Sequence, residues 1–149
     1  MAALLDYAFN EAAIGTNSLP FPLLPGVEVG LATINLTTYA ADNTLQFQGT
    51  VGWQPDLALL TPLLPVVTFR IRVGGSAPSF PLLFETSDSA FLGTGILLPL
   101  LSNPVTTSFT HAEKATAVRP DAYFLTAELV GLGAASIVGP VHLSGSVIG

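Results

Sequence analysis

Two histidines are the residues best suited to chemistry in this 149-residue sequence. His111 lies in the run Ser108-Phe109-Thr110-His111-Ala112-Glu113-Lys114, in which a hydrolase would use Ser108 or Thr110 as its nucleophile. In a β-strand, however, these two hydroxyl side chains point to the face opposite His111. The spacing therefore favours a polar strand end that runs into a loop, and it does not favour a catalytic site.

His142 lies in an uncharged segment near the C-terminus. A metal site would need a second histidine two or four residues away, and a general base would need a nearby carboxylate; neither is present in the sequence. We expect His142 to be buried or to lie at an interface. If a symmetric assembly brings copies of His142 together, protonation would oppose association at low pH. An oligomer whose mass is the same at pH 8 and pH 5 would contradict this hypothesis.

Arg70 and Arg72 occupy one face of a predicted strand, where they could pair with Glu85, Asp88 or Glu128, or bind an anionic group. Ion pairing is favoured because ten acidic residues face only four basic ones. The sequence around Asp88 lacks the alternating carboxylates of a calcium loop. Motifs of serine hydrolases, phosphate-binding loops and zinc proteases are absent, and there is no cysteine. The sequence therefore predicts a protein that is not an enzyme and has no cofactor or metal.

Charged residues are scarce throughout the chain. They make up 9% of the sequence, whereas hydrophobic residues make up 50%, and about 25% charged residues is usual. A lone globule with so few charges would be poorly soluble, so we expect other copies of the chain to cover much of its surface. A net charge of −6 with four basic residues excludes the basic patch of a nucleic-acid-binding protein.

Neither a membrane span nor a secretory signal is expected. The richest apolar stretch, from Leu57 to Val67, is interrupted by Thr61, Pro62 and Pro65, whereas a spanning helix needs about 20 apolar residues. The first nine residues contain Asp6 and no basic residue, which is unlike a signal peptide.

Twelve prolines and fourteen glycines divide the chain into short segments, which predicts an all-β protein with little helix. Alternation of apolar and polar residues is clearest in 44–54 and 66–73. The other predicted strands are 27–38, with a bulge near Ala32 and Thr33, 80–86, 91–98, 106–111, 122–130 and 136–148. Eight such strands predict a single jelly-roll β-sandwich formed by residues 27–149.

The last predicted strand has a face without charge, formed by Val138, Pro140, His142, Ser144, Ser146 and Ile148. A strand with one face in water normally carries charged side chains there. Two explanations stay open: burial within the sandwich, or burial against a neighbouring subunit.

Residues 1–26 form an extended, hydrophobic and proline-rich N-terminal arm. The alternating prolines of Leu19–Pro25 prevent a helix, and the arm is too apolar for a solvated disordered tail. It must pack along its own domain as a covering strand or dock on another copy. The apolar residues available for this are Leu4, Leu5, Tyr7, Phe9 and Ile14.

Several runs together resemble small jelly-roll proteins of the complement-globular-head and tumour-necrosis-factor type from spore-forming Firmicutes. The similar runs are Val67–Arg72, Glu85–Ser89, Thr106–His111, Tyr123–Glu128 and Ile137–Gly145. The resemblance covers residues 27–149 and concerns proteins of the exosporium and of spore appendages. The chain lacks the Gly-X-Y collagen stretch of the better-known exosporium glycoproteins.

The resemblance implies a homotrimer whose interface includes the last strand, which would place Val138, His142, Ser144, Ser146 and Ile148 at the contact. It also implies that the N-terminal arm joins one trimer to the next, with Leu4, Leu5, Tyr7, Phe9 and Ile14 as the connector. A repeated contact of this kind does not close and generates a filament. The expected location is the spore surface, where an anchor protein would be a further partner.

Two other functions are alternatives for this sequence. A module that binds carbohydrate or a receptor would expose aromatic residues in its loops, for which Trp53 and Tyr39 are the candidates, although Trp53 is expected in the core. A hydrolase or cupin-like enzyme would need clustered histidines and carboxylates, whereas the two histidines are far apart in the sequence.

Overall fold

The computed structural model describes residues 1–12, 19–56, 65–90, 104–131 and 133–149. In this part of the chain every regular element is a β-strand. The strands are β1 (Leu4–Ala12), β2 (Phe21–Pro22), β3 (Val29–Thr37), β4 (Thr44–Asp56), β5 (Val66–Val73), β6 (Leu82–Ser89), β7 (Val105–Lys114), β8 (Pro120–Leu129) and β9 (Ala134–Ile148).

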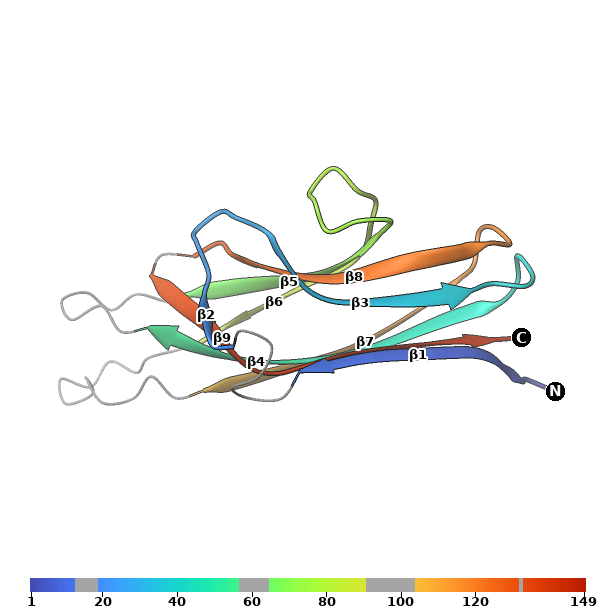
Figure 1. The fold of residues 1–149 in the computed structure, drawn as a ribbon, viewed down its shortest axis with the longest axis horizontal. Coiled ribbons are helices and arrows are strands. Elements are labelled where there is room, and N and C mark those ends of the chain that lie inside the picture. Colours follow the sequence, from blue (N-terminus) through green and yellow to red (C-terminus); the bar gives the residue numbers. More distant parts are fainter. Residues whose placement is uncertain (13–18, 57–64, 91–103, 132) are drawn as a thin grey trace.

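Two antiparallel sheets pack face to face as a sandwich (Figure 1). Sheet A has the order β1-β9-β4-β7, with β2 also paired to β9, and sheet B has the order β3-β8-β5-β6. Neighbours in space are mostly distant in sequence, and successive strands cross between the sheets, as in a jelly roll. The predicted fold class, an all-β jelly-roll sandwich, is confirmed.

The alternation of apolar and polar residues explains strands β4 and β5, which the sequence predicted most clearly. In β4, Leu45 and Phe47 face the core, whereas Gln46 and Gln48 are exposed. Strand β5 has the bounds that its alternation predicted. A register shift between Gly30 and Ala32 of β3 provides the bulge that the slip in its apolar pattern predicted.

Other boundaries differ from the predictions. Strand β6 starts at Leu82 instead of residue 80, because Phe80 belongs to a turn in which its N–H donates to the Ala77 carbonyl oxygen at 3.0 Å. Strand β9 starts at Ala134, two residues earlier than predicted. The strand predicted at 91–98 lies outside the described residues.

The described parts of the N-terminal segment, residues 1–12 and 19–26, lie along their own domain in this single chain. Strand β1 pairs with residues 141–148 of β9, and β2 pairs with Ile137 and Ser136 on the same edge of β9. Strands β1 and β2 thus belong to sheet A in this single chain, and the division into an arm of residues 1–26 and a jelly-roll domain of residues 27–149 stays a prediction. The use of this segment as a connector between copies stays a prediction.

The core between the sheets contains Trp53, as expected, with no exposed surface. Its indole Nε1–H donates to Thr107 Oγ1 at 2.9 Å, and the Thr107 hydroxyl donates to Asp88 Oδ2 at 2.7 Å. This chain of hydrogen bonds links β4 and β7 of sheet A with β6 of sheet B. Among the described elements there is no helix that could span a membrane.

Candidate functional site

The candidate site is the side of sheet A that faces away from sheet B, here called the outer face of sheet A. Strand register defines its rows of neighbours, because side chains of directly paired residues lie on the same face. The rows are Leu4-Ile148-Thr44-Lys114, Tyr7-Ser146-Gln46-Ala112, Phe9-Ser144-Gln48-Thr110 and Glu11-His142-Thr50-Ser108. Val138 and Pro140 continue the same face along β9.

This face brings together two sets of residues that the sequence analysis treated separately. All five predicted interface residues lie on it, with Ser144 buried and the other four partly exposed: Val138, His142, Ser144, Ser146 and Ile148. Three of the predicted connector residues, Leu4, Tyr7 and Phe9, lie beside them on β1. Leu5 lies at the register shift of β1 and approaches Gly149, and Ile14 is outside the described residues.

Tyr7 and Phe9 form an exposed aromatic pair at the edge of this face. Their ring centroids are 6.2 Å apart, and the two residues are 55% and 62% exposed. Alternation along β1 gives both rings the same outward direction. An exposed apolar cluster on a polar face with few charged residues is typical of an interaction surface.

His142 has a carboxylate neighbour that the sequence analysis missed. Glu11 of β1 lies directly opposite it, with 3.8 Å between His142 Nδ1 and Glu11 Oε2. Thr50 lies on the other side of His142 but is joined to Ser108, at 3.2 Å between the two hydroxyl oxygens. The row contains an acid, a histidine and a hydroxyl, yet no hydrogen bond joins His142 to Thr50 in the described structure.

His111 is placed away from any nucleophile. Its Nε2 lies 3.1 Å from Glu113 Oε2, and its ring stacks on Phe84 at 4.9 Å between centroids. Ser108 and Thr110 point to the outer face, on the other side of β7, as the alternation predicted. Within the described residues, no group of three or more histidines and carboxylates could hold a metal ion.

Two shallow depressions lie on the outer face of sheet A, on either side of Gln46 and Gln48. One, of about 180 Å³, is lined mainly by these glutamines with Tyr7, Ser144 and Ser146. The other, of about 260 Å³, is lined by the same glutamines on the β7 side. Amides and hydroxyls dominate the first depression, whereas the second also has Phe47, His111 and Ala112 in its lining, so this surface can form neutral hydrogen bonds and aromatic contacts.

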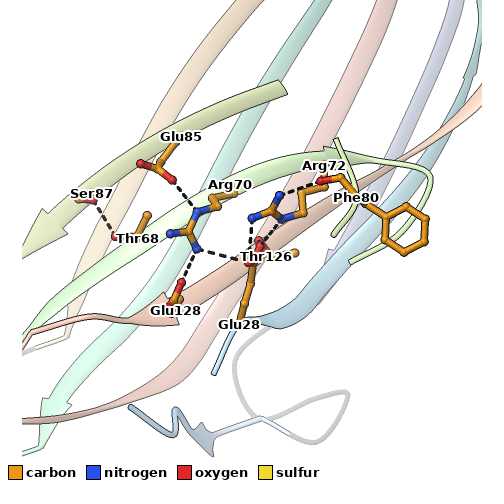
Figure 2. Close-up of polar contacts among 9 residues, drawn as sticks. All are labelled: Glu28, Thr68, Arg70, Arg72, Phe80, Glu85, Ser87, Thr126 and Glu128. Carbon is orange, nitrogen blue, oxygen red and sulfur yellow. Dashed lines mark hydrogen bonds and ion pairs between the residues drawn. The ribbon is translucent and has the colours of Figure 1, made fainter. Parts of the chain in front are cut away.

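The two arginines of β5 are engaged in ion pairs on the outer side of sheet B (Figure 2). Arg72 binds Glu28 through two nitrogens, at 2.6 Å and 3.0 Å, and Arg70 binds Glu85 at 2.6 Å and Glu128 at 2.5 Å. Pairing with Glu85 and Glu128 was predicted, whereas Glu28, 44 residues before Arg72, was missed.

Asp88 does not join this cluster, contrary to one of the predicted options. It lies on the inner side of β6, because it pairs in register with the buried Val67, and its carboxylate accepts from Thr107. Glu85 and Asp88 therefore lie on opposite faces of β6 and have different surroundings.

Glu28 and Arg70 have shifted pKa values. Burial alone would raise the pKa of Glu28, but hydrogen bonds from Arg72 and Thr126 and the charges of both arginines outweigh it and lower the pKa. Burial likewise opposes the charged form of Arg70, yet the hydrogen bonds to Glu85 and Glu128 raise its pKa. The cluster thus stabilises its own charges, and the arginines are occupied by protein carboxylates instead of an external anion.

No known protein-family model matches this chain, and no curated protein matches it. Among solved structures, it is similar to a structure of infectious bursal disease virus, Gx strain, with a TM-score of 0.51 and 14% identity. That match covers 98% of this chain and 40% of the viral chain, so the chain spans less than half the length of that protein. A structure described as CBM4 structure and function matches with a TM-score of 0.33 and 11% identity, over 99% of this chain and 76% of the other. At these identities the likeness to the viral chain shows the fold alone.

Proposed function

We propose that this chain is a non-enzymatic structural protein that assembles with copies of itself through the outer face of sheet A. One observation carries the proposal: this face exposes Tyr7 and Phe9, and the charged residues that the described strands place on it, beside His142, are Glu11, Lys114 and, at the end of β4, Asp56. Burial of apolar area stabilises an interface by about 25 cal/mol per Å². Few charges would then lose their hydration on contact, which keeps the cost of association low.

The proposed unit is a homotrimer around a threefold axis. Its contact is formed by the outward residues of β9, namely Val138, His142, Ser144, Ser146 and Ile148, with β1 at the border. Small side chains at Ser144 and Ser146 allow two sheets to approach closely. The resemblance to complement-head and tumour-necrosis-factor-like proteins supports the threefold symmetry.

The N-terminal segment, residues 1–26, is proposed to join one trimer to the next through Leu4, Leu5, Tyr7, Phe9 and Ile14. Such a heterologous contact does not close, so its repetition produces a filament. The proposed setting is the spore surface, as part of an exosporium or an appendage, with an anchor protein as a further partner. Support for this setting comes from the resemblance of the sequence to spore proteins of Firmicutes.

Replacing Ser146 with lysine should break the proposed trimer contact. The substitution places a charge in the middle of the proposed contact, where burial without a partner is costly. Sedimentation at micromolar concentration should show particles of at least three times 15.4 kDa for the natural chain and smaller particles for Ser146→Lys. Asn35→Lys is the matched control, because Asn35 is exposed on sheet B. A natural chain that sediments only at 15.4 kDa would reject the proposal.

A second candidate function is the binding of neutral glycans on the same face. The observation in its favour is the depression that Tyr7, Gln46 and Gln48 line together, since aromatic rings stack on sugars and amides bind hydroxyls. The loop aromatics favoured by the sequence do not form such a site: Trp53 is buried, and Tyr39 is exposed in a turn. Glycan binding would need this face to be uncovered, so the two functions exclude one another.

Calorimetric titration with neutral β-linked oligosaccharides tests the second candidate. If it is right, binding is saturable, Tyr7→Ala weakens it at least tenfold, and Tyr39→Ala leaves it unchanged. Absence of saturable binding across a glycan panel would exclude it.

A further inference from the structure

We infer that the contact between copies on the outer face of sheet A is regulated by pH through Glu11 and His142, and that copies associate more tightly as His142 gains a proton. The inference rests on the proposed self-assembly and adds the regulation of the same face. The two residues, Glu11 on β1 and His142 on β9, are here called the acid–histidine pair.

The acid–histidine pair lies on two strands that run side by side in sheet A (Figure 1). Glu11 and His142 are directly opposite each other in the antiparallel register, with 3.8 Å between His142 Nδ1 and Glu11 Oε2. The side chain of His142 is 30% exposed and that of Glu11 is 57% exposed. Water therefore reaches both groups in the single chain, and a second copy that covers the face would remove it.

The neighbours of His142 on this face, apart from Glu11, carry no charge. Strand β4, on the other side of β9, places Thr50 beside the histidine. Along β9 the outward neighbours are Pro140 and Ser144. Glu11 is therefore the one charged group that the described strands place next to the imidazole.

The other charged residues of the outer face lie far from the acid–histidine pair. Lys114 and Asp56 are in the rows of Ile148 and Ala134, at the two ends of β9 and six or more residues from His142. At about 3.3 Å per residue this separation is roughly 20 Å or more, whereas salt screens charges over about 8 Å. The residues outside the described ranges include no acidic residue, no basic residue and no histidine. The pair therefore sets the charge of this part of the face.

Protonation of His142 lowers the cost of covering this part of the face. When the imidazole is neutral, the Glu11 carboxylate would lose water in the contact with no cation beside it, which is costly. Histidine side chains gain their charge between about pH 8 and pH 5. Once His142 is charged, the two groups compensate each other and enter the contact without net charge. Association therefore takes up protons, and linkage requires tighter association at lower pH.

The carboxylate of Glu11 reverses the effect expected for His142 alone. Without it, imidazolium groups of several copies would meet as like charges, and acid would oppose association. With Glu11 on the adjacent strand, each imidazolium has an opposite charge within its own chain. The sign of the pH dependence therefore reports whether the acid–histidine pair lies in the contact.

Sedimentation of the natural chain over a range of concentrations, at pH 8 and at pH 6, measures this dependence. We expect the concentration at which half the chains are assembled to fall about tenfold from pH 8 to pH 6, because each copy takes up a proton. Glu11→Gln should reverse the trend, because the protonated His142 then has no partner. His142→Gln should abolish the trend, because a glutamate keeps its charge throughout this range.

Two control variants separate the pair from the net charge of the protein. His111→Gln removes the other histidine, which lies on the inner side of β7 with its Nε2 3.1 Å from Glu113 Oε2. Glu85→Gln removes one carboxylate, as Glu11→Gln does, but on the outer side of sheet B. Both controls should keep the trend of the natural chain. A trend that is reversed or abolished in Glu85→Gln as in Glu11→Gln would show that net charge, and not the acid–histidine pair, determines it.

Two further results would overturn the inference and can be told apart. If the natural chain assembles but its half-assembly concentration is the same or higher at pH 6 than at pH 8, the regulation is rejected while the proposed assembly holds. A natural chain that never exceeds 15.4 kDa in sedimentation at either pH would reject the assembly and its regulation together.

Discussion

Replacing Glu28 with alanine should lower the free energy of unfolding by about 3–5 kcal/mol, which is the usual cost of removing one partner of a buried ion pair. The side chains of Glu28 and Arg72 are only 2% and 9% exposed. The carboxylate receives two hydrogen bonds from Arg72 and one from Thr126. Its loss leaves the Arg72 guanidinium buried, with the Phe80 carbonyl oxygen as its one remaining partner among the described residues. Urea unfolding at pH 7 measures the change.

Glu85→Ala is the matched control. Glu85 also binds an arginine of β5, at 2.6 Å from Arg70 Nε, but its side chain is 47% exposed. Water can replace the carboxylate there, and Arg70 keeps its ion pair with Glu128. We therefore expect the free energy of unfolding to fall by less than about 1 kcal/mol. Equal losses in the two variants would show that burial does not determine the strength of these pairs.

The stabilisation that Glu28 gives to the folded protein should also disappear in acid. The pKa of Glu28 is lowered from its ordinary value of 4.5 in the folded protein, so the unfolded chain takes up a proton first as the pH falls. The stabilisation is therefore complete above the unfolded pKa and is lost as the pH falls through the folded one. In the same urea experiment, the difference between the natural chain and Glu28→Gln should narrow steadily below pH 4.5.

The parts of the fold that could be predicted are those where side-chain burial alone determines the pattern. Strands β4 and β5 each have one face in the core, so their sequences alternate. Strand β1 inverts this rule: Tyr7 and Phe9 point outward, whereas Asp6 and Asn10 point inward to bind the backbone of β3. Periodicity alone predicts the opposite orientation, and nothing in the sequence reveals the backbone groups that these polar residues satisfy.

The candidate site was predicted in its parts but not as a whole. The absence of charge on β9 was visible in the sequence, and so was the apolar character of residues 4–9. The residues of β9 and β1 share one face because these two strands pair, although they are far apart in the sequence. The same pairing brings Glu11 to His142. Glu28 was missed for a similar reason, since it precedes β3 and reaches Arg72 only through the order of strands in sheet B.

Trp53→Ala should destabilise the fold by about 3–5 kcal/mol, the usual cost of removing a large aromatic side chain from a core. Trp53 has no exposed surface, and its indole N–H is held by Thr107. Trp53→Phe keeps most of the ring but loses that hydrogen bond, so a loss of about 1–3 kcal/mol is expected. The difference between the two variants in the free energy of unfolding measures the packing of the part of the ring that phenylalanine keeps.

Thr107→Val extends this test to the link between the sheets. Valine has nearly the shape of threonine but leaves both the Trp53 N–H and the Asp88 carboxylate without their common partner. We expect the free energy of unfolding to fall at least as much as in Trp53→Phe, because two polar groups lose their hydrogen-bond partner instead of one. Since Thr107 faces the core, sedimentation of the folded variant should match that of the natural chain. If Thr107→Val folds completely but no longer assembles, the contact between copies involves more than the outer face of sheet A.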